Sequence, residues 1–220
     1  MKKKIKDKLL TILVPLKDRK QFTIRFFRFY TKFNFKYKLV IADGSKNKLT
    51  KKDLKILDEN KVQYKYKSYP YDKDLKTFVE KISKSLNSVD TKYVMLFDND
   101  DFLVKSTINR CLYLLENNTK LKACSGYLIN FDLHQPIKNR NLIELYGEPI
   151  NFQKMKHGNN FLSNNKYKRI NNYFFNKDIN TYNDICLTKN LKKVYKELAK
   201  LTFNYIYFYF ILADIMNYHN

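Results

Sequence analysis

Along the first half of the chain, two patterns of apolar and polar positions alternate. Short apolar runs, typical of strands buried in a parallel sheet, lie at 9–14, 38–42 and 93–97, and the alternating stretch 62–67 predicts a further strand. Between them, apolar residues recur every three or four positions and predict helices over 18–33, 50–59, 74–86 and 106–115. This alternation predicts an α/β fold in which helices flank a mostly parallel central sheet.

The pattern weakens beyond Gly126. Residues 135–180 are rich in Asn and Lys and contain few long apolar runs, which predicts a looped, partly ordered segment. Helical patterning returns over residues 187–216. With 220 residues and no internal repeat, the chain is expected to form a single domain, residues 1–220.

Polar residues follow three of the predicted strands. Pro15 is expected to end the first strand, and the charged residues 17–19 come soon after it. The turn 43–45, Asp-Gly-Ser, follows the second strand, and the segment 98–101, Asp-Asn-Asp-Asp, follows the fourth. Because ligands of parallel sheets bind beyond the carboxyl ends of the strands, these three segments are the expected functional site.

The segment 98–101 carries the most informative chemistry. Asp98, Asp100 and Asp101 crowd three carboxylates at the end of a buried strand, where like charges raise one another's pKa unless a cation neutralises them. Mg²⁺ and Mn²⁺ prefer carboxylate oxygens and share their ligand shell with substrate phosphates. The alternative is a solvated turn that caps the next helix, but the position directly after a buried strand favours a metal site.

The other two segments indicate contacts with a nucleotide. Asp43 is expected to accept hydrogen bonds from a base or a ribose, and the alternative is a plain Asp-Gly turn. Lys17 and Arg19 are expected to reach nucleotide phosphates. Asp18 has a simpler alternative role, since it is suited to cap the N-terminus of the helix that follows.

Charge and composition narrow the classes of function. The chain has 43 Lys and Arg against 21 Asp and Glu, a formal net charge of +22. This excess is spread out and does not form the concentrated basic face of a nucleic-acid module, so a solvated basic surface and no nucleic-acid partner are expected. The 3 cysteines form no CxxC pair, which disfavours a disulfide framework or a structural zinc site and favours a reducing compartment.

Several common sequence motifs are missing. The sequence has no Gly-rich phosphate loop, dinucleotide fingerprint or nucleophile elbow, which disfavours P-loop enzymes, dinucleotide oxidoreductases and serine hydrolases. The apolar run 9–16 is short and lacks a cleavage site, so no signal peptide is expected. Residues 205–216 include Asp214 and are too short and too polar to span a bilayer.

Together, the strand-end segments resemble the family 2 type of glycosyltransferases, which have the GT-A fold. Residues 12–19 resemble the family's opening strand and nucleotide-contacting turn, 42–45 its D-G-S motif, and 91–103 its metal-binding strand with the D-x-D-D motif. The resemblance implies a GT-A Rossmann-like sandwich with a central mostly parallel sheet flanked by helices. Residues 1–130 would bind a nucleotide diphosphate sugar, and residues 131–220 would form the acceptor side.

The resemblance also implies roles for single residues. Asp98, Asp100 and Asp101 would hold Mg²⁺ or Mn²⁺ against the diphosphate, and Asp98 or Asp100 would also contact the ribose. Asp43 would bind the nucleobase. Lys81 would help to hold the phosphates, and the alternative for it is an exposed helical lysine. The residues that would flank the nucleotide are Pro15, Lys17 and Arg19.

The catalytic base stays open between two residues. Family members that invert the anomeric centre use a late Asp or Glu as general base towards the acceptor hydroxyl, and the candidates here are Asp184 and Asp214. Leu16 and Asp18 replace the Thr and Asn that are usual in the first turn. The implied substrates are a nucleotide diphosphate sugar, with a UDP-sugar favoured, and a glycan or lipid-linked acceptor. The protein is expected to be cytoplasmic, and a lipid-linked acceptor would place it in peripheral contact with an anionic membrane face.

Two other classes of function also stay open. A non-catalytic basic protein on an inactive transferase scaffold would bind nucleic acid, an anionic membrane or an acidic glycan, and its binding would fall steeply with salt. A nucleotidyltransferase also uses carboxylates and a divalent metal. It usually needs a Gly-rich loop at the first strand end, and none occurs there in this sequence.

Overall fold

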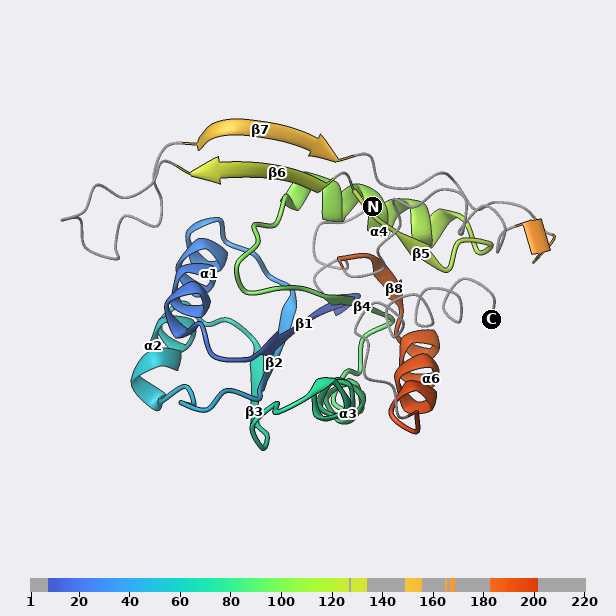
Figure 1. The fold of residues 1–220 in the computed structure, drawn as a ribbon. Coiled ribbons are helices and arrows are strands. Elements are labelled where there is room, and N and C mark those ends of the chain that lie inside the picture. Colours follow the sequence, from blue (N-terminus) through green and yellow to red (C-terminus); the bar gives the residue numbers. More distant parts are fainter. Residues whose placement is uncertain are drawn as a thin grey trace.

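The computed structural model describes residues 8–126, 128–133, 149–155, 165, 167–168 and 183–201. Within this part of the chain, six strands form one sheet in the order β3-β2-β1-β4-β8-β5 (Figure 1). Strands β1 to β4 run parallel, whereas β8 is antiparallel to both β4 and β5. The strands are β1 (Leu10–Leu16), β2 (Lys38–Asp43), β3 (Tyr64–Ser68), β4 (Tyr93–Leu96), β5 (Ala123–Cys124) and β8 (Ile185–Leu187).

Helices cover both faces of this sheet. Helices α1, α2 and α4 lie over one face, and α3 and α6 lie over the other (Figure 1). Their apolar residues belong to the two cores on these faces. A separate two-stranded antiparallel sheet consists of β6 (Leu128–Leu133) and β7 (Pro149–Met155). The helices are α1 (Lys20–Lys32), α2 (Lys51–Glu59), α3 (Leu75–Leu86), α4 (Lys105–Asn117) and α6 (Thr188–Leu198).

Burial on both faces explains the continuous apolar runs of the central strands. In β1, Leu10, Ile12 and Val14 belong to the core that includes α1 and α4, whereas Leu13 belongs to the core that includes α3 and α6. Every residue of β1 is buried. A strand covered on both faces has no solvent side, so it shows no alternation of polar residues.

The strand order determines where a ligand-binding crevice lies. β2 and β3 lie on one side of β1, and β4 lies on its other side. The crossover helix α1 covers one face and α3 covers the other. The order therefore reverses between β1 and β4, and such a switch point opens a crevice at the carboxyl ends of the strands.

The predicted α/β class, with a mostly parallel sheet flanked by helices, is confirmed. The prediction that Pro15 ends the first strand is wrong, because β1 continues to Leu16 and Pro15 lies in register with Ala42. On the β4 side, pairing with β1 ends at Leu13, whose carbonyl accepts from Phe97 N. The N–H that Pro15 lacks is therefore not needed in the sheet.

Other differences concern short or late elements. β5 and β8 were not predicted, since two and three residues are too few to show a period. β7 falls within residues 135–180, which were predicted to be looped. Of the residues 187–216 with predicted helical patterning, Thr188–Leu198 form α6, residues 199–201 are not helical, and residues 202–216 lie outside the described residues. Within the described ranges, no helix is long and apolar enough to cross a membrane.

Candidate functional site

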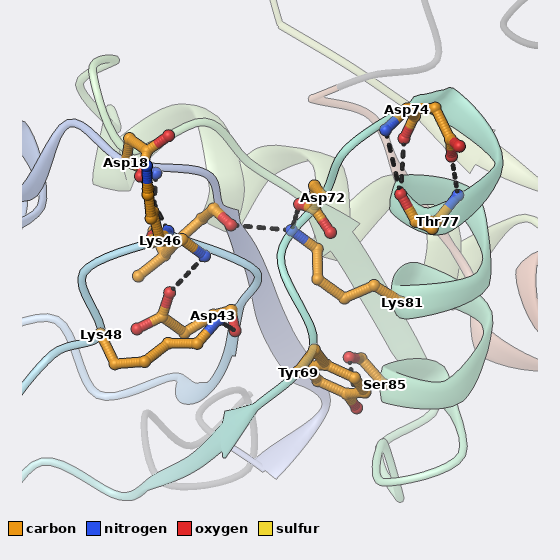
Figure 2. A network of polar contacts seen from close by, with 12 residues as sticks. Asp18, Asp43, Lys46, Lys48, Tyr69, Asp72, Asp74, Thr77, Lys81 and Ser85 are labelled. Carbon is orange, nitrogen blue, oxygen red and sulfur yellow. Dashed lines mark hydrogen bonds and ion pairs between the residues drawn. The ribbon is translucent and has the colours of Figure 1, made fainter.

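The turn between β1 and α1 has a strained backbone. Asp18 and Arg19 adopt left-handed conformations with φ of 59° and 54°. Asp18 N donates to Ser45 Oγ at 2.8 Å, and Asp18 Oδ1 accepts from Lys46 N at 2.9 Å (Figure 2). The capping alternative for Asp18 is wrong, because Arg19 is the N-cap of α1 and no side chain caps it. Asp18 instead joins the ends of β1 and β2.

Helix α1 holds the acidic segment that follows β4. Arg19 Nη1 lies 2.6 Å from Asp100 Oδ2, and Arg25 Nη2 donates to the Asp100 carbonyl at 2.7 Å. Asn99 Nδ2 donates to Thr23 Oγ1 at 2.8 Å. These contacts bring two predicted site residues, Arg19 and Asp100, together across the switch point.

Arg25 is a positioning residue that sequence patterning does not identify. A basic residue in a helix usually faces solvent, yet Arg25 is only 7% exposed. Its guanidinium lies 4.8 Å from the Phe22 ring centroid and 4.9 Å from that of Phe102, an arrangement that suits a planar cation. Phe22 on the same helix is a weak indication in the sequence that Arg25 has an aromatic neighbour. Phe102 gives no such indication, because it is distant from Arg25 in the sequence. Arg25 thus fixes the backbone of Asp100.

Asp101 lies in an electrostatically unfavourable place for a carboxylate. Burial raises the pKa of Asp101 and the neighbouring Asp100 raises it further, while Asn183 and Arg25 lower it. Asn183 Nδ2 donates to Asp101 Oδ2 at 3.4 Å. The Asn183 Oδ1 atom is buried and has no hydrogen-bond partner within the described residues. Asn183 precedes the unpredicted strand β8, so no sequence pattern indicates it.

The three carboxylates of the acidic segment do not form a three-ligand cluster. Asp100 contacts Arg19, Asp101 contacts Asn183, and Asp98 is half-buried. In the part of the chain that the structure describes, no three His, Cys, Asp or Glu side chains are grouped so that they could hold a metal ion. Mg²⁺ in proteins is commonly bound by one or two carboxylates, with substrate phosphates and water completing its shell.

Asp43 closes the loop that follows β2. Its carboxylate is 0% exposed: Oδ1 accepts from Ser45 N at 2.9 Å, and Oδ2 accepts from Leu49 N at 2.9 Å and Tyr66 Oη at 2.8 Å. Burial opposes ionisation, but the hydrogen bonds from Leu49, Ser45 and Tyr66 outweigh it and hold the pKa of Asp43 below its ordinary value of 3.8. Both oxygens thus stabilise the loop, and the base contact of Asp43 stays a prediction.

Lys81 reaches from α3 to the end of β1 (Figure 2). It is 2% exposed, and its Nζ donates to the Leu16 carbonyl at 2.8 Å and forms an ion pair with Asp72. Burial lowers the pKa of Lys81 and raises that of Asp72. The alternative of an exposed helical lysine is wrong, because Lys81 lies next to Ile82 on the buried side of α3. Its contact with phosphates stays a prediction.

The Asp72 carboxylate explains the glycine of the Asp-Gly-Ser turn. Asp72 N donates to the Gly44 carbonyl at 3.0 Å, and a Cβ at position 44 would collide with the Asp72 carboxylate. The buried Asp72 Oδ1 has no hydrogen-bond partner within the described residues. Gly44 is therefore required for close approach. No motif in the sequence indicates Asp72.

Cationic side chains line the rim of this edge. Lys17 is exposed, with its Nζ 5.5 Å from the Tyr71 ring centroid. Lys48 Nζ donates to the Asp43 carbonyl at 3.0 Å (Figure 2). Pro15 is buried within β1. The structure thus places Lys17 and Arg19 at the carboxyl edge of the sheet, as predicted, with Pro15 beneath them in the strand.

The two candidate bases lie in different situations. Asp184 is 4% exposed, and its carbonyl accepts from Cys186 Sγ at 3.7 Å. Hydrogen bonding with Cys124, burial and the nearby Asp184 charge raise the pKa of Cys111. Asp184 therefore lies in the interior, beside buried thiols. Asp214 lies outside the described residues.

No protein-family model matches the chain, and no curated protein matches it. Among solved structures, TarS 1–349 from S. aureus is similar, with a TM-score of 0.49 and 16% identity over 84% of this chain and 48% of TarS 1–349. TarS 1–349 has also been solved in complex with UDP-GlcNAc and with UDP. The chain thus spans about half the length of TarS 1–349.

Two further solved structures are similar to this chain. Bifunctional IspDF from Campylobacter jejuni matches with a TM-score of 0.41 and 15% identity, over 89% of this chain and 45% of that one. The 2-C-methyl-D-erythritol 4-phosphate cytidylyltransferase from Thermus thermophilus matches with a TM-score of 0.44 and 11% identity, over 93% of this chain and 81% of that one. Sequence identities of 11–16% and TM-scores of 0.41–0.49 do not assign the chain to a family.

Proposed function

We propose that the chain is a glycosyltransferase that binds a nucleotide diphosphate sugar at the carboxyl ends of β1, β2 and β4 and transfers the sugar to an acceptor hydroxyl. The observation that carries this proposal is the 2.6 Å contact between Arg19 and Asp100, which joins two strand ends at the switch point. This contact places the exposed Arg19 guanidinium beside the partly buried Asp100 carboxylate. The resemblance of these segments to family 2 glycosyltransferases favours sugar transfer over other nucleotide chemistry.

The exposed cations are proposed to bind the diphosphate. The Arg19 side chain is 61% exposed although it is paired with Asp100. A guanidinium has five N–H donors, so Arg19 can keep this pair and still donate to a phosphate oxygen. Lys17, which is exposed on the same turn, supplies a second positive charge. Both charges balance part of the negative charge of a diphosphate.

Asp100, Asp101 and Asn183 fit a divalent cation that the substrate would help to bind. Burial and the adjacent Asp100 both disfavour the charged form of Asp101, and a bound cation would reverse this. The orphaned Asn183 Oδ1 is a further oxygen of the kind that Mg²⁺ and Mn²⁺ accept. We propose that these residues hold Mg²⁺ or Mn²⁺ together with the diphosphate, while Asp98 contacts the ribose. When bound, the metal would offset charge on the departing diphosphate.

The acceptor side belongs to the same proposal. The acceptor is proposed to be a glycan or a lipid-linked hydroxyl, and peripheral contact with an anionic membrane stays a prediction. The general base stays open between Asp184 and Asp214. Because Asp184 is 4% exposed, its use as a base requires the surrounding segment to open when the acceptor binds.

Calorimetric titration with UDP, with and without Mn²⁺ or Mg²⁺, tests the nucleotide site. We expect metal-dependent binding by the unaltered protein and loss of the metal-dependent part in Asp101→Asn, which keeps the side-chain shape. Arg19→Ala is expected to weaken UDP binding with or without metal. Glu59→Gln is the matched control, because Glu59 is 60% exposed and pairs with Lys55 on its own helix. It removes the same charge as Asp101→Asn and is expected to leave binding unchanged.

The outcomes separate the classes of function. If the unaltered protein shows no metal-dependent binding of UDP or GDP, the proposal fails. Binding that ignores nucleotide sugars and falls steeply with salt would instead support a basic binding protein on an inactive scaffold. After a positive titration, a screen of nucleotide sugars for metal-dependent hydrolysis identifies the donor.

A further inference from the structure

A cavity lies at the opposite end of β4 from the proposed nucleotide site. It has a volume of about 580 Å³ and is lined by residues from 89–93, from 115–122 and from 187–192. The first range leads into β4, the second lies at the end of α4 and beyond, and the third begins α6. The acidic segment 98–101 follows the carboxyl end of β4. The cavity is thus separate from the proposed nucleotide site.

The charges of the cavity are predominantly positive. Its lining includes four lysines and two acidic residues, Asp90 and Glu116. Glu116 Oε1 accepts from Lys92 Nζ and from Tyr93 Oη, each at 2.7 Å, and Asp90 pairs with Lys38 at 2.7 Å. Both carboxylates are therefore already neutralised by nearby donors. The lysines of the lining are Lys92, Lys122, Lys189 and Lys192.

The N-terminus of α6 opens on this cavity. Its N-cap, Leu187, provides no side-chain hydrogen bond, and the first turn contains no acidic residue. The first N–H groups of a helix carry a partial positive charge and bind anions readily. Lys189 and Lys192, on the first two turns, add full charges at the same place.

Thr188 provides an independent indication that the cavity takes a polar ligand. It lines the cavity and is 6% exposed. Its Oγ1 is buried and has no hydrogen-bond partner within the described residues. A buried hydroxyl without a partner is rare, because it loses its hydrogen bonds to water without replacement. An oxyanion in the cavity would accept from this hydroxyl.

We infer that this cavity binds a phosphate group through Thr188 Oγ1, the N–H groups of Lys189 and Asn190 and the ammonium groups of Lys189 and Lys192. The N–H group of Thr188 does not take part, because it donates to the Lys92 carbonyl at 3.0 Å. Lys192 Nζ donates to the Val89 carbonyl at 2.8 Å, which fixes it at the wall and leaves further N–H groups for a ligand. The site does not depend on the proposed transfer reaction. The phosphate is either a free soluble one or the headgroup of a phospholipid.

Site-resolved NMR with inorganic phosphate as the probe tests the inference. We expect the amide signals of residues 188–190 to shift and to saturate. In Lys189→Ala and Thr188→Val, phosphate affinity at these signals should fall, by about fivefold for the lysine change. Lys196→Ala is the matched control, since Lys196 is exposed near the other end of α6. Lys196→Ala should leave the phosphate-induced shifts at residues 188–190 unchanged. Saturating the nucleotide site with UDP should also leave these shifts unchanged.

Vesicles distinguish the two sources of the phosphate. Vesicles of phosphatidylcholine with phosphatidic acid are compared with vesicles of phosphatidylcholine alone. If Lys189→Ala weakens binding to the acidic vesicles more than Lys196→Ala does, the ligand is a lipid headgroup. If only the NMR effect depends on Lys189, the ligand is a soluble phosphate. The inference is overturned if the phosphate-induced shifts at residues 188–190 do not saturate, or if they are equal in Lys189→Ala and Lys196→Ala. This conclusion does not depend on whether the protein binds UDP.

Discussion

The buried ion pair of Lys81 and Asp72 leads to a strong prediction for Lys81→Met. Asp72 is 1% exposed, and one of its carboxylate oxygens already lacks a partner within the described residues. Methionine would leave this carboxylate buried without its paired cation, and breaking a buried pair in this way costs about 3–5 kcal/mol. The lost hydrogen bond to the Leu16 carbonyl adds about 1 kcal/mol. The sum is a large fraction of the stability of a typical domain, about 5–15 kcal/mol.

Urea unfolding followed by far-UV circular dichroism measures this loss. Lys84→Met is the control, because the Lys84 side chain is 67% exposed, and a change within about 0.5 kcal/mol is expected. Burial disfavours the charged forms of both partners, as the raised pKa of Asp72 and the lowered pKa of Lys81 indicate. The double variant Lys81→Met/Asp72→Asn buries no charge and should recover more than half of the loss. A loss below about 1 kcal/mol in Lys81→Met, or no recovery in the double variant, would refute the reasoning.

Three further predictions concern single side chains. Asp43→Asn should destabilise the fold near neutral pH, because the lowered pKa of Asp43 means that its ionised carboxylate stabilises the folded state. This contribution is lost as the pH falls below 3.8, so the difference in the free energy of urea unfolding between the variant and the unaltered protein should shrink in acid. A difference that does not change with pH would contradict the prediction. Thr50→Ala removes the hydroxyl that accepts from Asp53 N but keeps the backbone N–H that donates to Asp53 Oδ2, so thermal unfolding should show a loss of about 1 kcal/mol. Thr50→Ser keeps the hydroxyl and should retain most of this stability. Arg25→Lys keeps the charge but not the planar contact with two rings, so UDP affinity should fall about fivefold by calorimetry as Asp100 loses its support; unchanged affinity would exclude a positioning role.

The location of the candidate site follows from the sequence because strand ends are local features. The apolar run of β4 leads directly into the acidic segment 98–101, and β1 and β2 also lead into polar turns. Parallel connection then brings all three ends to one edge without any knowledge of distant contacts. The contact of Arg19 with Asp100 agrees with this expectation.

The side chains that organise the site could not be predicted in the same way. Lys81 and Arg25 are charged residues on helices, and helical spacing alone places such residues towards solvent. Their burial depends on Asp72 and on the Asp100 backbone, which are brought near them only by the tertiary fold. Asn183 stands before a three-residue strand that has too few positions to show a period.

Strand β8 makes the central sheet depend on a late part of the chain. It pairs with β4 through Tyr93, Val94 and Met95, and with β5 on its other side. Until Leu187 has been synthesised, β4 is an open edge made of residues that are buried in the finished protein. An apolar edge of this kind pairs readily with other chains. A nascent chain that stalls before β8 is therefore expected to aggregate or to be held by chaperones, even though its first four parallel strands are complete.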